Sequence, residues 1–466
     1  IRRRGSNGVQ ADIALRGSSF EQVLILVNGI RMSDSQTGHN SMSLPFDLAS
    51  VERIEVIKGP SARSFGQNAY AGVVNIITKA SDEENVLVSG SGGDFGTYAL
   101  GLGANFGSKK VSNFIQVNTA SSEGYRYNTD YKISNIYYQN EIALQNGKLK
   151  FQAGIQEKKF GANGFYASPS ATDQYEETQA SIVSLGLNQN FNTIKLNSNI
   201  YWRRGQDMYE YIRNKPEIYR NMHIGNNIGA ELNGTYHSGL GITGLGVELR
   251  KEFLASNNLG HRERFITQVF MEHHFSFIQN KLNISPGISW ANYAEEGNFF
   301  YPGLDVGFDL TENHKFYGNI AKVNRIPTFT DLYYVSKTEA GNPGLKPEHA
   351  VAAELGYRYQ INNFVGKVSG FLRNSDNSID WVKQNVNDIW RAENIGEIDT
   401  KGIEVELSQH FESFVKSYSV GYTFLESKNS QPQNLMSRYV MENLKHQFVA
   451  KLENRFFKNL TNQLVY

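Results

Sequence analysis

The sequence predicts an all-β membrane protein whose bulk is a transmembrane antiparallel β-barrel. Three observations predict this fold class. The 466 residues include 43 glycines, 28 phenylalanines and 25 tyrosines but only 10 prolines, which suits many strands joined by turns. Long segments alternate apolar and polar side chains. The connections between these segments alternate between short and long, as in a barrel with short periplasmic turns and longer extracellular loops.

Composition and charge exclude several other classes. Lysine plus arginine equals aspartate plus glutamate at 46 each, so nothing indicates a nucleic-acid partner. The absence of cysteine excludes a disulfide framework and thiolate metal sites. The longest apolar run, residues 23–27, is far shorter than the ~20 residues of a membrane-spanning helix. A soluble β-sandwich stays as an alternative, but its loops need not alternate in length and its chain would have to split into several cores.

The alternating segments begin near residue 85 and continue to the end of the chain. Examples are "VSNFIQVNTA", "SNIYYQNEIAL", "KLKFQAGIQEKKF" and "ASIVSLGLNQNF". Short connections such as "LQNGK" and "HSGLG" take turns with long polar ones, of which the longest covers residues 323–349. This scheme gives about eighteen complete strands and the start of a nineteenth. Because single-chain bacterial barrels have an even strand number, we expect the sequence to be truncated at both ends.

One segment, "NIGEIDTKGIEVEL" at residues 394–407, shows the alternation plainly. Ile403, Val405 and Leu407 point to one side of the predicted strand, and Glu404 and Glu406 point to the other. A barrel explains this pattern, since an apolar row faces lipid and a polar row faces the lumen. We therefore expect both glutamates to face the barrel interior.

The first 80 residues lack the pattern of long alternating segments that the rest of the chain shows. The segments "IALRG", "VLILVNGIRM", "SVERIEVIKGPSARSFG" and "AYAGVVNIITK" resemble the second half of the plug domain of TonB-dependent outer-membrane receptors. Two later segments, "NPGLKPEHAVAAELGYRY" and "NIGEIDTKGIEVEL", resemble barrel motifs of the same family. The resemblance implies a plug domain at residues 1–80 inside a 22-stranded barrel at residues 81–466, of which about 18–19 strands are present.

The resemblance also implies a function. Such receptors perform no chemistry on their ligand, so we expect a transporter in the outer membrane of a Gram-negative bacterium and not an enzyme. The ligand would bind where plug apices meet extracellular loops, and periplasmic TonB would pull on the plug through a segment expected before Ile1. Outer-membrane lipid would surround the barrel. The sequence leaves open whether a surface lipoprotein also binds, and a passive porin, the competing class, would have no plug.

Four charged residues are expected to hold the plug in the barrel. By motif position, the resemblance implies that Arg16 and Lys58 of the plug contact Glu354 and Glu404 of the barrel. Charges in a lumen of low effective dielectric hold well only when paired. Lys58 stands where arginine is more usual, so the bidentate geometry is lost at that corner. The alternative is that all four are hydrated lumen charges.

The two plug apices, "RGSNGVQAD" and "SDSQTGHNSMS", are rich in serine, asparagine, glutamine and glycine. Such small neutral groups suit an amide-decorated neutral ligand better than an iron-chelate trianion, which would need a basic cage. The first apex and the loop strings "GYRYNTDY" and "KKFGANGFYASPSATDQYE" also resemble cobalamin-type receptors. A corrinoid, cobalamin first, is therefore the expected ligand, with a ferric siderophore or haem as the alternative. The expected ligand-binding residues are Ser6, Asn7, Val9, Gln10, Gln36, Thr37, His39, Asn40, Tyr125, Tyr127 and Tyr166.

His39 is a special case among these residues. An exposed imidazole at a plug apex could approach a corrin cobalt or another metal. A single histidine in a polar turn is also ordinary as a loop residue, and both interpretations stay open. Loop aromatics could stack on a planar ligand or belong to the interfacial girdle of the barrel. Besides the tyrosines named above they are Phe165, Tyr209, Tyr211 and Tyr219.

Two neighbouring long loops contain the carboxylates Asp130, Asp173, Glu176 and Glu177. Oxygen ligands of this kind could order the loops around a structural calcium ion. Their spacing matches no calcium-loop motif, which favours solvated carboxylates. We expect no cofactor and no other metal.

Overall fold

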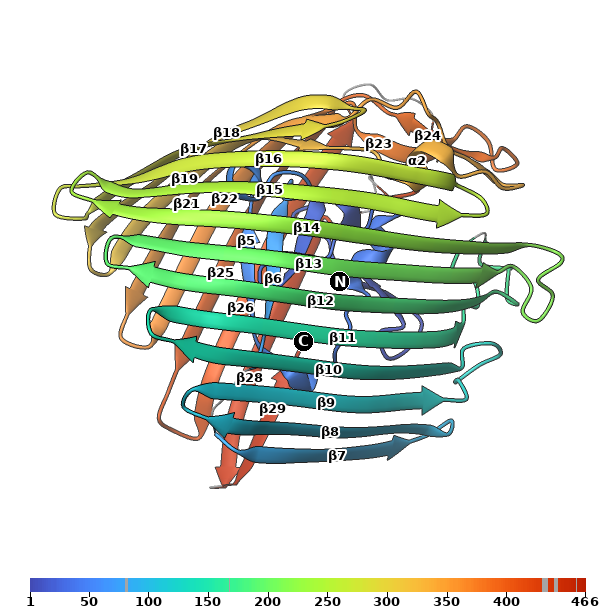
Figure 1. Ribbon diagram of the computed structural model, residues 1–466, viewed down its shortest axis with the longest axis horizontal. Helices are drawn as coiled ribbons and strands as arrows, with labels where there is room; N and C mark the ends of the chain where they lie inside the picture. Colours follow the sequence, from blue (N-terminus) through green and yellow to red (C-terminus); the bar gives the residue numbers. More distant parts are fainter. Residues whose placement is uncertain (80–82, 167, 430–434, 440–442, 458) are drawn as a thin grey trace.

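A barrel of strands encloses a small N-terminal domain (Figure 1). The computed structural model describes residues 1–466 apart from 80–82, 167, 430–434, 440–442 and 458. Within the described residues, the N-terminal elements end at Thr78 and the first barrel strand begins at Asn85. The expected domain boundary between residues 80 and 81 lies outside the described residues.

In the described part of the chain, nineteen strands form the barrel sheet, as the count of alternating segments predicts. They follow one another around the sheet in chain order, and successive strands pair antiparallel. The strands are β7 (Asn85–Gly93), β8 (Thr97–Ser108), β9 (Val111–Ser122), β10 (Tyr131–Leu144), β11 (Gly147–Gly161), β12 (Tyr175–Phe191), β13 (Ile194–Glu210), β14 (Arg220–Ser238), β15 (Gly241–Ser256), β16 (Gly260–Phe277), β17 (Leu282–Tyr293), β18 (Gly297–Thr311), β19 (His314–Arg325), β21 (Glu348–Ile361), β22 (Phe364–Asp376), β25 (Ile398–His410), β26 (Val415–Asn429), β28 (His446–Phe457) and β29 (Leu460–Val465).

Strand β25 shows the two faces of the barrel wall. Ile403 and Leu407 are exposed on the outside of the barrel. Glu404 lies between them in sequence and points inward, where it contacts Arg16 of the N-terminal domain. Because side chains alternate along a strand, Glu406 points inward as well and contacts Lys58. The apolar outer row and acidic inner row expected for this segment are confirmed.

The barrel has a short-turn end and a long-loop end (Figure 1). Two residues, 239–240, connect β14 to β15, whereas residues 326–347 connect β19 to β21 at the other end. The long loops carry a short helix and a small four-stranded sheet with the order β20-β24-β23-β27. These elements are α2 (Phe329–Tyr333), β20 (Glu339–Ala340), β23 (Ile379–Lys383), β24 (Trp390–Asn394) and β27 (Met436–Ser437).

The N-terminal domain is built on a second four-stranded sheet with the order β4-β3-β6-β5 and a separate hairpin of β1 and β2. No helix in the described part of the chain is long and apolar enough to cross a membrane. The elements are β1 (Arg2–Arg4), β2 (Gln10–Asp12), η1 (Phe20–Gln22), β3 (Val23–Val27), β4 (Ile30–Arg31), η2 (Gly38–Met42), η3 (Leu48–Ser50), β5 (Val51–Lys58), α1 (Ala62–Phe65) and β6 (Gly72–Thr78).

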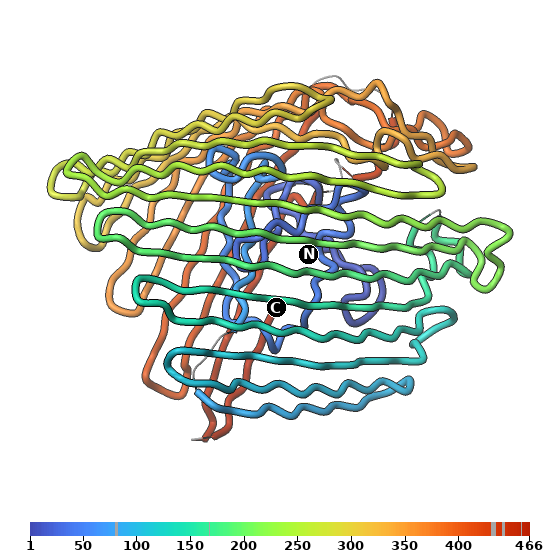
Figure 2. The backbone as a smooth tube through the Cα atoms, viewed as in Figure 1, coloured from blue at the N-terminus to red at the C-terminus, as the bar shows by residue number. Residues whose placement is uncertain are grey.

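Strand β3 anchors this domain to the barrel wall. All five of its residues are buried, and it pairs parallel with β6, so its sequence is a continuous apolar run. Val23, Ile25 and Val27 share one apolar cluster with Phe114 and Tyr137 of the wall. Figure 2 shows the N-terminal segment, in blue, within the curl of the barrel strands. The packing fixes which loops of the domain face the long-loop end.

Candidate ligand-binding site

A charge cluster joins the N-terminal domain to the barrel wall. Arg16 donates from Nη1 to Glu354 Oε2 at 2.9 Å, and from Nη2 to Glu354 Oε1 at 2.8 Å and Glu404 Oε2 at 3.0 Å. Lys58 Nζ donates to Glu404 Oε2 at 3.1 Å and to Glu406 Oε1 at 2.5 Å. The structure thus brings together the four residues that the family motifs single out. Glu406 is a fifth member that the motif positions do not include.

Local backbone geometry holds this cluster in place. Arg16 and Gly17 form a tight turn with positive φ values of 50° and 71°, which is uncommon for a residue with a long side chain. The Arg16 side chain is 6% exposed and the Lys58 side chain is 36% exposed. Burial disfavours the charged form of Arg16, but its hydrogen bonds to Glu354 and Glu404 outweigh burial and raise its pKa. Arg16 is therefore the better-anchored of the two cations.

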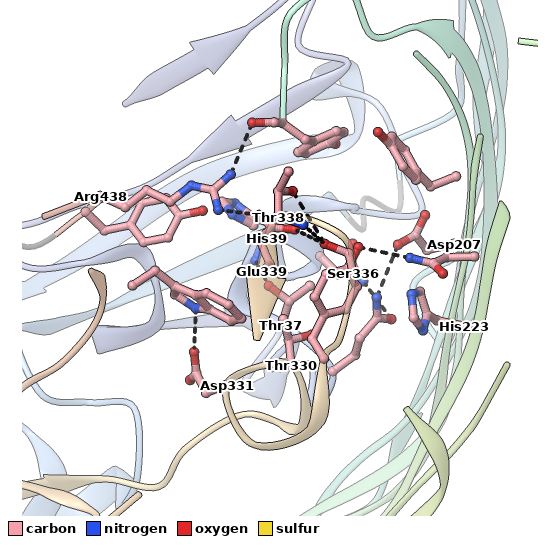
Figure 3. A pocket seen from close by; sticks show the side chains of 18 of the residues that line it. Thr37, His39, Asp207, His223, Thr330, Asp331, Ser336, Thr338, Glu339 and Arg438 are labelled. Atoms are coloured by element: carbon pink, nitrogen blue, oxygen red, sulfur yellow. Dashed lines mark hydrogen bonds and ion pairs between the residues drawn. The ribbon is translucent and has the colours of Figure 1, made fainter. Parts of the chain in front are cut away.

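A cavity of about 420 Å³ lies between the N-terminal domain and the long loops, a size typical of small-molecule sites. In Figure 3, Thr37 and His39 lie between Asp207 and His223 on one side and Arg438 on the other. The N-terminal domain contributes Gln10, Ser19, Phe20, Glu21, Gln36, Thr37, His39 and Asn40. Barrel strands and long loops supply the rest of the wall, chiefly residues 207–223, 325–339, 379–381 and 438–439.

Six of the eleven residues expected to bind ligand line this cavity, namely Gln10, Gln36, Thr37, His39, Asn40 and Tyr166. The structure does not place the other five on its wall. Val9 is buried instead against Phe160 and Ala162. Ser6 and Asn7 lie at the tip of the β1–β2 hairpin, and Tyr125 and Tyr127 are exposed outside the cavity.

His39 is not the exposed imidazole that the sequence suggests. Its side chain is 14% exposed, its ring stacks on Phe20 with centroids 3.9 Å apart, and its Nδ1 lies 2.8 Å from Asp12 Oδ1. Burial lowers the pKa of His39, and Asp12 opposes this only in part. The expectation of exposure is wrong because Phe20 and Asp12, distant in sequence, cover the ring.

Aromatic side chains dominate the cavity wall. The expected residues Tyr166, Tyr209, Tyr211 and Tyr219 all line it. Four further aromatics were missed, and they are Phe20, Tyr334, Trp381 and Tyr439. Phe165 does not line the cavity. Flat rings around a cavity can stack on a planar ligand or hold a cation.

The four carboxylates proposed for calcium have separate partners, and Glu176 and Glu177 lie on β12 and not in a loop as expected. Asp130 accepts from Arg213 at 2.6 and 2.9 Å, and Asp173 accepts from a tyrosine hydroxyl at 2.7 Å. Glu177 accepts from Tyr175 at 2.8 Å, and Glu176 accepts from Tyr166. Among the described residues, no three His, Cys, Asp or Glu side chains are grouped to hold a metal ion.

Most charged residues of the cavity were also missed by sequence reasoning, and Glu176 was considered only as a calcium ligand. Among the described residues, the cavity wall has six carboxyl side chains and three cationic side chains. They are Glu21, Glu176, Asp207, Asp331, Glu339 and Asp380, with Arg325, Lys337 and Arg438. One signal could have located Asp331, because Thr328 and Asp331 form a capping box at the start of α2.

Two of the three cations already have carboxylate partners. Arg325 contacts Glu21, lies 3.2 Å from Asp331, and lies 3.2 Å from Glu348 behind the wall. Arg438 pairs with Glu339. Lys337, the third cation, is exposed. Carboxyl groups therefore outnumber cationic side chains on the described part of the cavity wall.

Comparisons with known proteins agree with this architecture. Residues 1–73 match the family model for the TonB-dependent receptor plug domain, and residues 92–453 match the TonB dependent receptor-like β-barrel. The vitamin B12 transporter BtuB of Vibrio vulnificus (strain CMCP6) is 24% identical, with 99% of this chain and 75% of that protein covered. A hemin receptor of Yersinia enterocolitica is 24% identical, with 76% and 58% covered.

A solved structure shows the same fold. The ferric enterobactin receptor PfeA of Pseudomonas aeruginosa, in a mutant form, superposes with a TM-score of 0.79 at 19% identity, covering 97% of this chain and 78% of that one. Because the barrel model alone covers most of the sequence, the assignment does not depend on one relative. The chain belongs to the TonB-dependent receptors, which are transport proteins of the Gram-negative outer membrane.

Proposed function

We propose that this receptor takes up a corrinoid, with cobalamin as the first candidate. The observation that carries the proposal is the lining of the cavity, which combines neutral amide side chains with aromatic rings. Gln10, Gln36, Asn40 and Asn221 can donate to and accept from the amides of a corrin periphery. The tyrosines can stack on the macrocycle or its appended base.

The charge of the cavity supports the same choice over a ferric siderophore. An iron-chelate trianion needs cations that are free to pair with it. Arg325 and Arg438 already face carboxylates at 3.2 Å or less, and the acids outnumber the bases two to one. The similarity to a relative named as a vitamin B12 transporter over 99% of the chain supports the proposal further.

Transport through the barrel would use the arrangement common to the family. The ligand would bind at the long-loop end, and TonB would act on the plug from the periplasmic side. No group on the cavity wall needs to change the ligand chemically, so we propose no enzymatic step. Calcium in the loops and a surface lipoprotein stay predictions.

Equilibrium binding of cyanocobalamin to the purified receptor tests the proposal, with haem and ferric siderophores as competitors. We expect sub-micromolar binding that weakens about tenfold in Gln36→Ala, because the amide loses its contacts with the ligand. Ser6→Ala, outside the cavity, serves as the matched control and should bind normally. Tight binding of a competitor without any corrinoid binding would reject the substrate and keep the transporter.

Haem is the second candidate, and one observation favours it. His39 and His223 both line the cavity, and a neutral imidazole is a common ligand of haem iron. His39 resembles a metal ligand in one further respect, since its Nδ1 contacts the carboxylate of Asp12. Binding of haem with a spectral shift that is lost in His39→Gln would favour haem over corrinoid.

A further inference from the structure

Two buried acceptor atoms on the cavity wall have no donor. Gln10 is 9% exposed, and its Oε1 has no hydrogen-bond partner among the described residues. Asp207 accepts from Gln36 Nε2 at 3.1 Å through Oδ2, whereas its Oδ1 is buried and without a partner in the same part of the chain. A buried acceptor without a donor is costly, so both atoms point to a hydrogen-bond donor on the ligand.

Asp207 and Glu176 belong to one acidic patch on the barrel wall. On neighbouring strands, Asp207 of β13 pairs with Thr178 of β12, and Glu176 lies two residues along on the same face. On the other side, Thr178 pairs with Lys158 of β11. Two carboxyl groups and one ammonium group therefore share this part of the barrel wall.

Two cations lie near the patch, and each also donates to a backbone carbonyl of another segment. Lys158 is buried and donates to the Val9 carbonyl at 3.4 Å. Arg4 lies 5.5 Å from the centre of the Tyr166 ring and donates to the Phe165 carbonyl, and it does not line the cavity. In Figure 3, Asp207 faces the cavity from the barrel wall, on the side opposite Arg438. Asp207 and Glu176 both line the cavity.

Aromatic rings surround the acidic patch on the cavity side. Tyr166 donates its hydroxyl to Glu176, and its ring packs edge-on against Tyr209, with centroids 5.5 Å apart. The centroid of the Tyr209 ring in turn lies 6.4 Å from the centroid of the Tyr219 ring. Aromatic faces beside carboxylates form a typical binding site for an organic cation.

We propose that Gln10, Glu176 and Asp207 bind a positively charged hydrogen-bond donor of the ligand, so that the receptor selects cationic over neutral and anionic forms. The inference rests on the proposed function in taking this cavity as the ligand site. For a corrinoid it predicts a preference for a cationic form, such as aquocobalamin, over neutral cyanocobalamin. A cation could pair with the carboxylates as well as fill the acceptors, whereas a neutral amide could only fill the acceptors.

Two ligand pairs matched in structure but differing in charge test the inference on the full-length receptor by equilibrium binding. One pair is aquocobalamin and cyanocobalamin. The other is ferrioxamine B, which is cationic, and ferrioxamine E, which is neutral. The second pair has no exchangeable site on its metal, so it separates charge from coordination by a histidine. Haem and ferric enterobactin serve as anionic probes.

We expect the cationic member of at least one pair to bind about tenfold or more tightly than its neutral partner, as for a hydrogen bond to a charged group. Asp207→Asn should remove most of this preference without weakening the neutral partner, and Glu176→Gln provides a second variant. Glu263→Gln, an exposed glutamate on β16, controls for long-range charge and should change neither affinity.

The possible results distinguish a failure of the cation site from a failure of the corrinoid proposal. Equal affinity within both pairs, tightest binding of an anionic probe, or binding of no cationic probe would overturn the cation site. Ferrioxamine B binding that depends on Asp207, without corrinoid binding, would support the cation site and reject the corrinoid. Equal binding of both cobalamins and of both ferrioxamines would retain the corrinoid and reject the cation site.

Discussion

Removing Arg16 should release the plug from the barrel far more readily than removing Lys58. Arg16→Met deletes three hydrogen bonds to carboxylates, so that Glu354 loses its Arg16 contacts and Glu404 keeps only its contact with Lys58. Breaking such a buried pair costs about 3–5 kcal/mol. Lys58→Met removes a cation that is 36% exposed, so solvent screening reduces its contribution to about 1 kcal/mol or less.

A single cysteine can report plug release, because the sequence contains none of its own. Ser50 is fully buried where η3 contacts Gln116 of the barrel wall, so a thiol at Ser50→Cys reacts only after the plug moves. With fast reclosing, the labelling rate follows the opening equilibrium. Arg16→Met should raise this rate more than about a hundredfold, and Lys58→Met about fivefold or less.

The exposed Arg53 on β5 provides the matched control, since Arg53→Met removes a cation from the same strand as Lys58 without touching the cluster. It should leave the labelling rate unchanged. If Arg16→Met accelerates labelling no more than Lys58→Met does, burial does not decide the strength of this cluster and the reasoning fails.

Three further predictions concern single residues of the plug and loops. Burial lowers the pKa of His39 in the folded plug below its ordinary value of 6.5. The free energy of unfolding of the plug should therefore be highest above pH 6.5 and fall as the pH drops below that value. His39→Gln should reduce this pH dependence, measured by urea unfolding. Trp381→Phe removes the indole donor to Asp331 at 3.1 Å and should speed proteolysis of residues 326–347 by about tenfold. Gly59→Ala should raise the labelling rate about tenfold, because φ is 88° and the new Cβ would lie 3.3 Å from Glu354.

Matched variants separate these effects from general damage. Gly8 also has a positive φ, but a Cβ added there would have no atom within 4 Å, so Gly8→Ala tests backbone strain without the contact. Trp390→Phe changes an indole on the same loop sheet without removing the Asp331 contact. A steeper pH dependence in His39→Gln than in the unmodified receptor would contradict the burial argument.

The barrel could be predicted from sequence because its signals are local. Alternation within each strand decides which side chain points inward, so the inward direction of Glu404 follows from its neighbours Ile403 and Val405 alone. The contact between Glu404 and Arg16 is different, because 388 residues separate the two. Only the motif positions of a known family could place those two charges together.

The cavity was only partly predictable because its wall is assembled from distant loops. The apex glutamines were found because they follow recognisable plug strands. Asp207 was not, since it lies within a strand and its role depends on Gln10 and Glu176 of other elements. Burial of His39 was missed for the same reason, because a turn sequence does not show what packs over it. Long-range packing, and not local propensity, decides both cases.

One short segment of the plug connects the cavity to the charge cluster. Phe20 and Glu21 line the cavity, and Glu21 contacts Arg325 of the barrel. Five residues earlier, Arg16 makes the buried pair with Glu354. The chain between Arg16 and Glu21 spans at most about 17 Å even when fully extended. A ligand that displaced Glu21 from Arg325 would therefore act directly on the turn that holds Arg16, without any change in the central sheet of the plug.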